Sequence, residues 1–325
     1  MSPPVFVIIL NWNGTADTLA AIASIEQQDY PNRHIVVVDN GSEKASVAAL
    51  LKPGRSFHLI RNAINRGFAG GCNTGIDYAL TQGAAYIWLF NSDASAPTDM
   101  LRILVETAEE DKRVGLVAPL MRDLPAPHQV INSCARFDRR TLIYNYTDDV
   151  DTMRAWHKHF PDQVALMGAA LLIRRAVVEQ IGGFDEALFA YWEDIDYSIR
   201  SSAAGFLNRL VKETALLHPA KYVYDRPGSV RPYYHYYMSR NEILLLRKHG
   251  AGLRGFKALR WATLQQLRNI ERLRNDEPAA HAALAGMWDG WLNRGGPFSP
   301  RRRMPQPYRT AMARYPALLR QLLGG

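Results

Sequence analysis

The sequence has little of what marks several common classes of protein. Only two of its 325 residues are cysteine, Cys72 and Cys134, so a disulfide scaffold is excluded and a reducing cytosolic setting is expected. It has no run of about 18 apolar residues, so we expect no membrane-spanning helix. The amino terminus lacks the basic segment and long apolar stretch of a signal peptide. Internal repeats are also missing, and these absences together indicate an ordinary globular protein.

Charge is distributed unevenly along the chain, whose formal net charge is +8. Residues 1–220 carry 20 Lys and Arg against 25 Asp and Glu, whereas residues 221–325 carry 19 against 6. We therefore expect a mildly acidic domain over 1–220 and a basic region over 221–325. The basic region indicates an anionic partner, for which a membrane surface and nucleic acid are both candidates.

Short apolar runs alternate with helical patterns through the first 120 residues. The runs that predict buried strands are 5–10, 34–39, 57–60, 86–90 and 114–118. Helices are expected at about 16–27, with Thr15 as N-cap, and at about 98–111, and a further helix after residues 65–75 is expected to end at about Gln82. Residues 164–173, 207–211 and 215–217 predict further strands, residues 120–163 a loop-rich excursion, and residues from 222 onward helices. This alternation predicts an α/β fold with a mostly parallel sheet and helices on both faces.

The stretch from Tyr86 to Asp93 organises these expectations. Its apolar half predicts a strand buried on both faces, and Asn91-Ser92-Asp93 follows directly. Ligands bind at the carboxyl edge of open α/β sheets, so Asp93 is a candidate to hold a divalent metal on a nucleotide diphosphate. The alternative is a carboxylate that caps a helix or stabilises a turn.

A basic amphipathic helix is predicted over residues 253–275. Its apolar stripe consists of Leu253, Phe256, Leu259, Leu264, Leu267 and Ile270. Arg and Lys crowd the other face, and such a helix can lie on an anionic membrane surface. The alternative is that the stripe packs on the domain or on a second subunit.

A series of motifs occurs in the order found in the family 2 (GT-A fold) inverting glycosyltransferases, which the chain resembles, and above all their rhamnosyltransferase-like branch. The motifs span residues 8–14, 36–42, 62–75, 90–93, 182–185, 192–196 and 236–241, with a tail motif at 286–290 and 294–295. The resemblance implies a GT-A catalytic domain over 1–220 with an α-helical C-terminal extension over 221–325 that contacts a membrane surface, the acceptor or a partner subunit.

The resemblance also implies a nucleotide-sugar site. The residues that it assigns to this site are Asn11, Asn13, Asp39, Asn40, Arg66, Gly67, Asn91 and Asp93. Asp39 can accept a hydrogen bond from the imide N–H of uracil or thymine, and the glycines near Gly67 let backbone approach phosphate, although an ordinary strand-to-helix turn explains them equally. Asp93 and His218 are expected to hold Mg²⁺ or Mn²⁺, and a purely structural role is the alternative for His218. Because position 91 is Asn, only one carboxylate of the family's paired motif is present, which leaves room for weak metal dependence.

The base that deprotonates the acceptor hydroxyl is placed by the resemblance at Asp194. The acceptor and sugar cleft is expected to include Gly168, Ala169, Trp192, Glu193 and Asp196. Acidic residues in the first turn of a helix also suit the helix dipole, so capping is the alternative for one or two of these acids.

The function implied is inverting transfer of a sugar from a dTDP- or UDP-sugar, with dTDP-L-rhamnose preferred, to a hydroxyl of a glycan or lipid-linked acceptor in cell-surface polysaccharide biosynthesis. UDP-galactofuranose, UDP-glucose and UDP-N-acetylhexosamine stay open as donors. A nucleotidyltransferase would need a basic glycine-rich signature near the amino terminus, and a nucleic-acid-binding protein a recognisable module; the sequence has neither. We expect a cytoplasmic protein, at the inner face of the membrane or free of it, with a homodimer as one further option.

Overall fold

The computed structural model describes residues 2–51, 54, 56–219, 230–273, 275–310 and 312. The chain divides into two compact units, each with its own contacts. The first comprises residues 1–138, 144–185 and 193–220, and the second comprises residues 139–143, 186–192 and 221–325. The second unit therefore includes two short insertions from within the first part of the chain.

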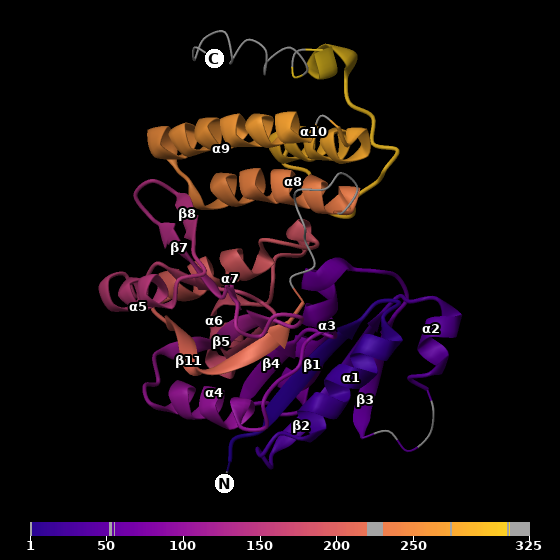
Figure 1. Ribbon diagram of the computed structural model, residues 1–325, viewed down its shortest axis with the longest axis vertical. Helices are drawn as coiled ribbons and strands as arrows, with labels where there is room; N and C mark the ends of the chain where they lie inside the picture. Colours follow the sequence, from indigo (N-terminus) through magenta and orange to yellow (C-terminus); the bar gives the residue numbers. More distant parts are fainter. Residues whose placement is uncertain are drawn as a thin grey trace. The chain divides into compact units, whose positions relative to one another are not determined.

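The first unit is built on an eight-stranded sheet with the order β11-β5-β10-β4-β1-β2-β3, in which β6 also pairs with β5 (Figure 1). The strands are β1 (Val5–Asn11), β2 (Arg33–Asn40), β3 (Phe57–Asn62), β4 (Tyr86–Phe90), β5 (Val114–Asp123), β6 (Val130–Ile131), β10 (Ala170–Arg174) and β11 (Leu207–His218). Neighbouring strands are parallel except where β10 runs antiparallel between β4 and β5 and β6 runs antiparallel to β5. The predicted α/β architecture with a mostly parallel sheet is confirmed.

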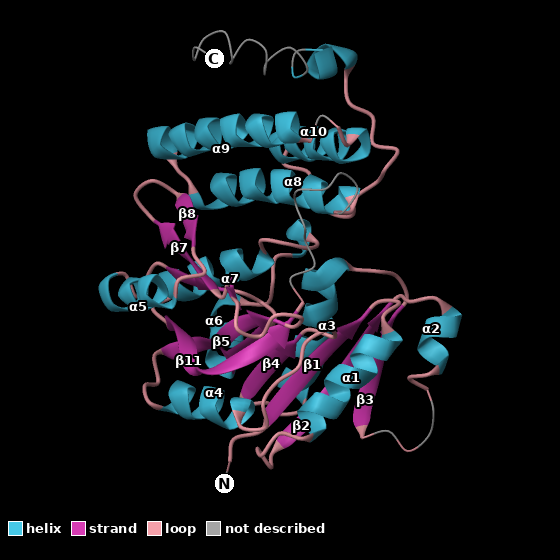
Figure 2. Ribbon diagram, viewed as in Figure 1, coloured by secondary structure: helices cyan, strands magenta, loops and turns pink. Residues whose placement is uncertain are grey.

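Helices cover both faces of this sheet (Figure 2). α1 (Thr15–Glu26) and α4 (Met100–Glu109) pack on one face, and α3 (Gly67–Thr81), α6 (Arg175–Ile181) and α7 (Glu193–Ala203) pack on the other. The short helix α2 (Lys44–Ala48) lies between β2 and β3 in the sequence. Because apolar helix faces cover both sides, a central strand has to be apolar on both sides as well.

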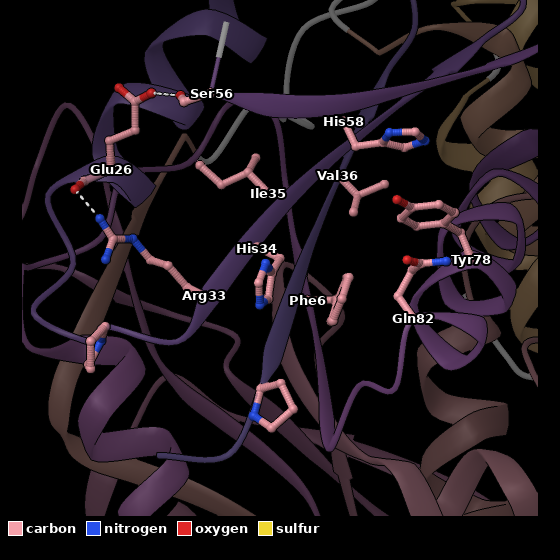
Figure 3. A pocket seen from close by; sticks show the side chains of 12 residues that line it. Phe6, Glu26, Arg33, His34, Ile35, Val36, Ser56, His58, Tyr78 and Gln82 are labelled. Atoms are coloured by element: carbon pink, nitrogen blue, oxygen red, sulfur yellow. Dashed lines mark hydrogen bonds between the residues drawn. The ribbon is translucent and has the colours of Figure 1, made fainter. Parts of the chain in front are cut away.

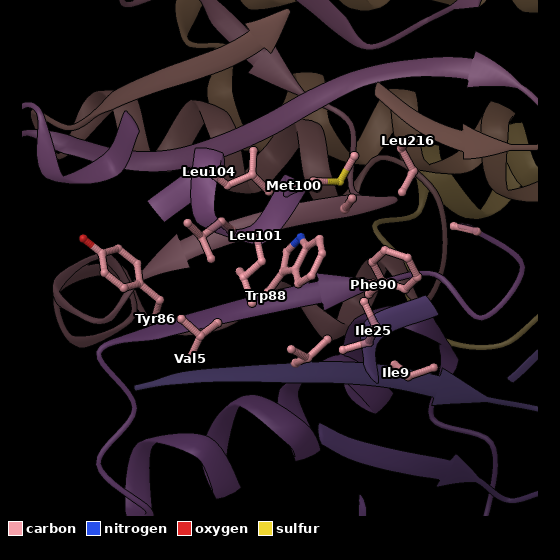
Figure 4. Close-up of a cluster of buried hydrophobic side chains, with 14 of the residues drawn as sticks. Val5, Ile9, Ile25, Tyr86, Trp88, Phe90, Met100, Leu101, Leu104 and Leu216 are labelled. Atoms are coloured by element: carbon pink, nitrogen blue, oxygen red, sulfur yellow. The ribbon is translucent and has the colours of Figure 1, made fainter. Parts of the chain in front are cut away.

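β4 shows this requirement most clearly, since all five of its residues are buried. Tyr86, Trp88 and Phe90 point into the cluster beneath α1 and α4 (Figure 4), whereas Ile87 and Leu89 join the cluster on the α3 side. A strand held this firmly on both faces gives the residues that follow it a fixed starting point.

The prediction of a loop-rich excursion over 120–163 is wrong. This segment completes β5 and contains β6, β7 (Cys134–Asp138), β8 (Ile143–Tyr146) and α5 (Val150–His159). Together with β9 (Val164–Leu166), two of these strands form a second sheet of order β8-β7-β9. The strands are short and their buried residues include the small Cys134 and Ala135, so their sequence lacks a strong apolar signal.

Two smaller expectations also fail. Thr15 is not an N-cap: it lies inside α1, whose N-cap is Gly14, and its hydroxyl donates to the Ser46 carbonyl instead. The strand expected over 164–173 is divided into β9 and β10 by residues 167–169. This interruption matters because it places Gly168 and Ala169 at the end of the sheet.

Among the described residues, the second unit contains η1 (Glu186–Leu188), α8 (Pro232–His249), α9 (Gly252–Arg272) and α10 (Glu277–Trp291). α10 approaches α8 closely because glycine stands at the contact: a Cβ on Gly286 would lie 2.2 Å from the Tyr236 carbonyl oxygen, and one on Gly290 would lie 2.9 Å from that of Arg240. None of the helices within the described residues is long and apolar enough to cross a membrane. The helical onset expected at residue 222 lies outside the described residues.

The predicted apolar stripe of α9 divides into two parts. Leu267 and Ile270 are buried with Ile243 of α8 and Met287 of α10. Leu253 and Phe256, near the start of the helix, are 69% and 61% exposed. Packing within the unit therefore accounts for the C-terminal part of the stripe only.

Candidate active site

Polar residues end the first two strands of the sheet and are fully enclosed. Asn11 ends β1 and donates from Nδ2 to Asp39 Oδ1 at 3.0 Å. Asp39 is 0% exposed, yet its Oδ2 accepts no hydrogen bond from the described residues, and Arg61 Nε lies 3.6 Å from it. A buried carboxylate oxygen without a donor is costly, so this atom is suited to accept a hydrogen bond from a ligand.

Asn40, the last residue of β2, has its hydrogen-bonding capacity filled by the protein. It donates to Asn65 Oδ1 and to the Gly67 carbonyl, and it accepts from Asn62 Nδ2 and from the Arg66 backbone N–H. Its side chain therefore shapes the loop that leads into α3. The nucleotide contact expected of Asn40 stays a prediction, and this geometry favours an indirect role.

Asn13 also supports a loop. Its backbone has a left-handed φ of 54°, its side-chain oxygen accepts from the Glu43 N–H at 2.8 Å, and its own N–H donates to Ser42 Oγ at 2.9 Å. Because these bonds join the loops after β1 and β2, Asn13 holds together the strand ends that carry Asn11 and Asp39.

The start of α3 combines an exposed arginine with closely packed glycine. Arg66 is exposed and donates to Thr74 Oγ1 at 3.0 Å, and Gly67 begins the helix at φ +75°. A Cβ on Gly71 would lie 2.4 Å from Leu10 Cδ1, and one on Gly75 would lie 2.4 Å from Ile8 Cγ2. Close packing of α3 on β1 thus explains these two glycines, whereas Arg66 and Gly67 lie at the helix start, where anions bind.

The segment after β4 brings Asn91, Asp93 and His218 together. His218 Nε2 lies 3.3 Å from Asp93 Oδ1 and 3.1 Å from Asn91 Nδ2. The end of β11 is held beside this segment by paired backbone hydrogen bonds between Ser95 and Leu217, both 2.9 Å. Residues 127 positions apart in the sequence are therefore fixed around one point at the sheet edge.

The donor atoms at this point fit a divalent cation that is shared with a diphosphate. A carboxylate oxygen suits Mg²⁺ or Mn²⁺, and an imidazole nitrogen is a further ligand for a transition metal such as Mn²⁺. Within the part of the chain that the structure describes, no group of three or more His, Cys, Asp and Glu side chains gathers in metal-binding geometry. Asp93 and His218 would therefore hold the ion only with phosphate oxygens or water as additional ligands.

Asp194 lies in the first turn of α7 and accepts two backbone hydrogen bonds. Gly168 N–H donates to Oδ2 at 2.9 Å, and Ile195 N–H donates to Oδ1 at 2.8 Å. Burial raises the pKa of Asp194 above its usual range, and the two N–H groups act against that rise. A partly buried carboxylate with a raised pKa, which pairs with no cation among the described residues, is a candidate general base.

Residues 167–169 connect the two carboxylates through backbone. The Asn91 N–H donates to the Ala169 carbonyl at 2.9 Å, and the adjacent Gly168 donates to Asp194. A Cβ on Gly168 would lie 3.3 Å from Asp194 Cβ, so the lack of a side chain there permits the contact. Asp93 and Asp194 thus belong to one edge of the first unit, although 100 residues separate them in the sequence.

The other acids of α7 have different surroundings. Glu193 is 6% exposed, and burial together with the charge of Asp194 raises its pKa well above the usual range; its Oε2 accepts no hydrogen bond from the described residues. Asp196 is 0% exposed and pairs with Arg200 at 2.8 Å. The cleft position expected for Asp196 stays a prediction, and this ion pair favours a structural role. Trp192, expected in the same cleft, is buried and belongs to the second unit.

Two residues that the sequence interpretation missed hold the turn at 182–185. Asn73 of α3 accepts from the Phe184 N–H at 2.8 Å and donates to the Phe184 carbonyl at 3.0 Å. Arg200 donates to the carbonyls of Ile181 and Gly183. The i, i+4 spacing of Asp196 and Arg200 was a usable signal, whereas nothing local to Asn73 indicates a partner 111 residues away.

A pocket of about 590 Å³ lies elsewhere in the first unit (Figure 3). Phe6 stacks on His34 with ring centroids 4.7 Å apart, and Tyr78 stacks on His58 at 4.3 Å, and these rings form part of its lining. Phe6 and His34 lie near the amino ends of their strands, whereas Asn11 and Asp39 lie at the carboxyl ends. The pocket is therefore separate from the site described above.

The sequence model of "Glycosyl transferase family 2" matches residues 6–182, which include the strand ends and the Asn91–Asp93 segment. The chain belongs to this family. Family 2 membership confirms the resemblance drawn from the motifs. The match ends before Asp194 and His218, so it does not itself cover the candidate base.

Relatives within family 2 include two kinds of transferase. An N-acetylglucosaminyl-diphospho-decaprenol L-rhamnosyltransferase of Mycobacterium tuberculosis is 26% identical over 202 residues, and the match covers 57% of this chain and 66% of that protein. The dTDP-rhamnosyl transferase RfbF of Shigella flexneri is 24% identical over 262 residues, which are 77% of this chain and 82% of that protein. The galactofuranosyltransferase GlfT1 of M. tuberculosis is 23% identical over 221 residues, covering 67% and 71%.

Solved structures of glycosyltransferases share the fold. The mannosyltransferase PcManGT from Pyrobaculum calidifontis, solved with GDP-Man and Mn²⁺, has a TM-score of 0.56 at 19% identity and covers 98% of this chain and 81% of its own. GalNAc-T7, solved with UDP, GalNAc and Mn²⁺, also has a TM-score of 0.56, at 13% identity and with 82% and 57% covered. The predicted GT-A fold class is therefore confirmed.

Proposed function

We propose that this family 2 protein is an inverting glycosyltransferase that moves a sugar from a dTDP- or UDP-sugar to a hydroxyl of a glycan or lipid-linked acceptor. The observation that carries the proposal is the backbone connection between Asp93 and Asp194 through residues 168–169. It supports the proposal because the segment that carries Asp93, the candidate metal ligand, and Asp194, the candidate base, both bond to residues 168–169 of the first unit. dTDP-L-rhamnose is our preferred donor, since two relatives are named as rhamnosyl transferases, and UDP-galactofuranose is the alternative.

In the proposed reaction the donor enters along the strand ends. Asp39 Oδ2 accepts the imide N–H of the uracil or thymine ring, and the start of α3 with Arg66 faces the diphosphate. Asp93 and His218 would hold the divalent cation that accompanies the diphosphate. When bound, that cation stabilises the charge that develops on the leaving nucleoside diphosphate.

Asp194 performs the proton transfer. Its carboxylate takes the proton of the acceptor hydroxyl as the acceptor oxygen forms a bond to the anomeric carbon and the bond to the diphosphate breaks. The N–H groups of Gly168 and Ile195 keep the carboxylate in place and ionised, and buried Glu193 stays protonated beside it because two adjacent charges are unfavourable. Attack from the face opposite the leaving group inverts the anomeric centre.

Features of the second unit support a membrane surface as the location of this reaction. α9 exposes Leu253 and Phe256 beside Arg254, Lys257 and Arg260, a combination that suits the interface of an anionic bilayer. Both cysteines are free and buried, which agrees with a reducing compartment. We therefore place the protein at the cytoplasmic face of the membrane, as a peripheral enzyme in cell-surface polysaccharide biosynthesis.

A thermal-shift screen tests the proposal directly. The purified chain is heated with dTDP-L-rhamnose, UDP-galactofuranose, UDP-glucose or UDP-N-acetylglucosamine, each with and without Mn²⁺, because a ligand of the native state raises the melting temperature. We expect a shift with thymidine or uridine diphosphates that grows with Mn²⁺. Absence of a shift with every one of them would overturn the proposal.

A further inference from the structure

The backbone just before α7 is strained. Phe189, Tyr191 and Trp192 have φ values of 63°, 67° and 74°, in the left-handed region that side chains other than glycine seldom adopt. Three bulky residues within four positions hold this conformation, and the next residue is Glu193, the first of α7. Such strain persists only where surrounding structure enforces it, and it concentrates at functional sites.

Asn241 of α8 supplies that enforcement. Its Nδ2 donates to the carbonyls of Leu188, Ala190 and Tyr191 at 2.9, 2.8 and 2.8 Å. One side-chain amide therefore binds the carbonyls on either side of Phe189 and the carbonyl that precedes Trp192. The side chain is 0% exposed, so water cannot replace these bonds.

Arg240 fixes Asn241 in turn. Its Nε donates to Asn241 Oδ1 at 2.8 Å, which orients the amide so that its NH₂ group faces the loop. Its Nη2 donates to the carbonyls of Ala187 and Leu188 at 3.2 and 2.7 Å, and its guanidinium lies over the Tyr236 and Tyr237 rings. Arg240 is also 0% exposed. A buried cation arranged in this way holds backbone in place rather than binding a ligand.

We propose that Arg240 and Asn241 are positioning residues, which lock residues 187–192 in their left-handed conformation directly before the first turn of α7. Asp194 lies two residues beyond Trp192 in the sequence, so we expect release of this conformation to loosen the first turn of α7 and the hydrogen bond from Gly168 to Asp194. The inference gives a role to the 236–241 motif, which the donor and acceptor chemistry leaves unexplained. Its catalytic part rests on the proposed function of Asp194, and its structural part does not.

Amide hydrogen exchange in the full chain tests the lock without any ligand. In Asn241→Ala we expect exchange at residues 187–196 to become about tenfold faster or more, because three buried hydrogen bonds are lost. Ser239→Ala is the matched control: Ser239 lies on the same helix, is 1% exposed and makes one buried bond, to Gln266. It should leave exchange at 187–196 unchanged. Equal effects of the two variants would overturn the proposal.

A glycine rescue separates backbone strain from general loss of stability. Glycine adopts a positive φ without strain, whereas alanine does not, and both remove the Phe189 ring. In the Asn241→Ala background, Phe189→Gly should restore slow exchange at 193–196 several-fold better than Phe189→Ala. If Asn241→Ala does not fold, the same two substitutions in the unaltered chain serve instead, and the glycine variant should melt at the higher temperature. No difference between glycine and alanine would contradict the strained lock.

Turnover supplies the catalytic part of the test, with the donor that gives the largest thermal shift. Loss of the Gly168 hydrogen bond raises the pKa of Asp194, so the acidic limb of the kcat profile should move to higher pH in Asn241→Ala and stay in place in Ser239→Ala. An unmoved limb together with faster exchange would refute the effect on Asp194. A wild-type chain that turns over no nucleotide sugar refutes the proposed function instead, while the exchange data still decide the lock.

Discussion

The two units use buried polar groups differently. In the first unit, Asp39 Oδ2 and Glu193 Oε2 are buried without a hydrogen bond from the described residues, and Asp194 accepts backbone N–H groups of Gly168 and Ile195. In the second unit, buried Arg240 and Asn241 donate to backbone carbonyls, and Arg240 also donates to the side-chain oxygen of Asn241. The first arrangement keeps acceptors available to a ligand, and the second fixes the shape of a loop.

This difference gives a criterion that separates residues which bind a ligand from residues which support the framework. A buried polar side chain whose donors and acceptors are all filled by protein is expected to support the framework, and the bonds of Asn40 in the first unit fit that description. A buried carboxylate with an unused oxygen has an energetic reason to bind something. Substitutions in the two groups should accordingly change different measurements.

The largest effect is expected for Asp194→Asn, which keeps the shape of the side chain and removes its basicity. We expect kcat for sugar transfer to fall about 1,000-fold, within the range that general bases contribute, while dTDP or UDP still raises the melting temperature. Asp17→Asn is the control, because Asp17 also lies in the first turn of a helix but is exposed. Near-normal turnover of Asp194→Asn, together with none in Asp93→Ala, would show that the base lies elsewhere.

The next largest effect is expected on the stability of the folded chain, from Glu242 in the second unit. This residue of α8 is 7% exposed and accepts a hydrogen bond from Gln266 Nε2. Burial raises its pKa from 4.5 to about 7, and the Gln266 bond opposes the rise. The folded chain therefore binds more protons than the unfolded chain between these two values. The stabilisation is fully present below pH 4.5 and is lost as the pH rises through about 7.

Urea unfolding at pH 5 and pH 8 measures this loss. As the pH rises from 5 to 8, the titration of Glu242 should lower the free energy of unfolding of the wild type by on the order of 3 kcal/mol. Glu242→Gln should show no such loss. The comparison between the two chains removes the opposite trend expected from His157, whose pKa burial lowers. Glu110→Gln, an exposed residue at the end of α4, should behave like the wild type. Parallel curves for wild type and Glu242→Gln would exclude a neutral Glu242.

A smaller and more selective effect is expected for Asp39→Asn. Loss of the charge-assisted bond to an imide N–H should weaken UDP or dTDP binding about tenfold. Cytosine has an acceptor nitrogen where uracil has the imide N–H, so the new amide donor should improve CDP binding. Titrating the wild type and Asp39→Asn with UDP and CDP shows whether the preference changes from the uracil to the cytosine nucleotide. If UDP and CDP lose affinity equally, Asp39 shapes the pocket without contacting the base.

The central sheet could be predicted from the sequence because each of its strands is marked by a local run of apolar residues. Tyr86–Phe90 is apolar on both faces as a covered strand has to be, and Asp93 comes shortly after it, while Asp39 is the last residue but one of β2. The site predictions that depend on strand ends could therefore be made from pattern and motif. The segment 120–163 could not be predicted, since its short strands carry small residues and acquire their apolar surroundings only from the second sheet.

Long-range hydrogen bonds account for the rest. Asn73 with Phe184, and Asn241 with Leu188, join positions 111 and 53 residues apart, and no spacing rule connects an asparagine with a distant carbonyl. The left-handed backbone at Phe189 was equally invisible, because phenylalanine gives no signal for a positive φ. These long-range contacts give the 182–185 and 236–241 motifs a structural role that the sequence alone does not indicate.

The smallest effect is expected on the exposed face of α9, and it tests whether the second unit binds a surface in addition to supporting a loop. Each cation near an anionic bilayer contributes about 1 kcal/mol, so Lys257→Gln should lower partitioning onto phosphatidylglycerol-containing vesicles about fivefold. Lys112→Gln, an exposed lysine of the first unit, is the matched control and should bind as the wild type does. Sedimentation with vesicles of pure phosphatidylcholine should show no difference between the variants, because the attraction requires anionic headgroups. Equal binding of both variants to the anionic vesicles would mean that α9 does not face the membrane, and the basic charge of residues 221–325 would then require another anionic partner.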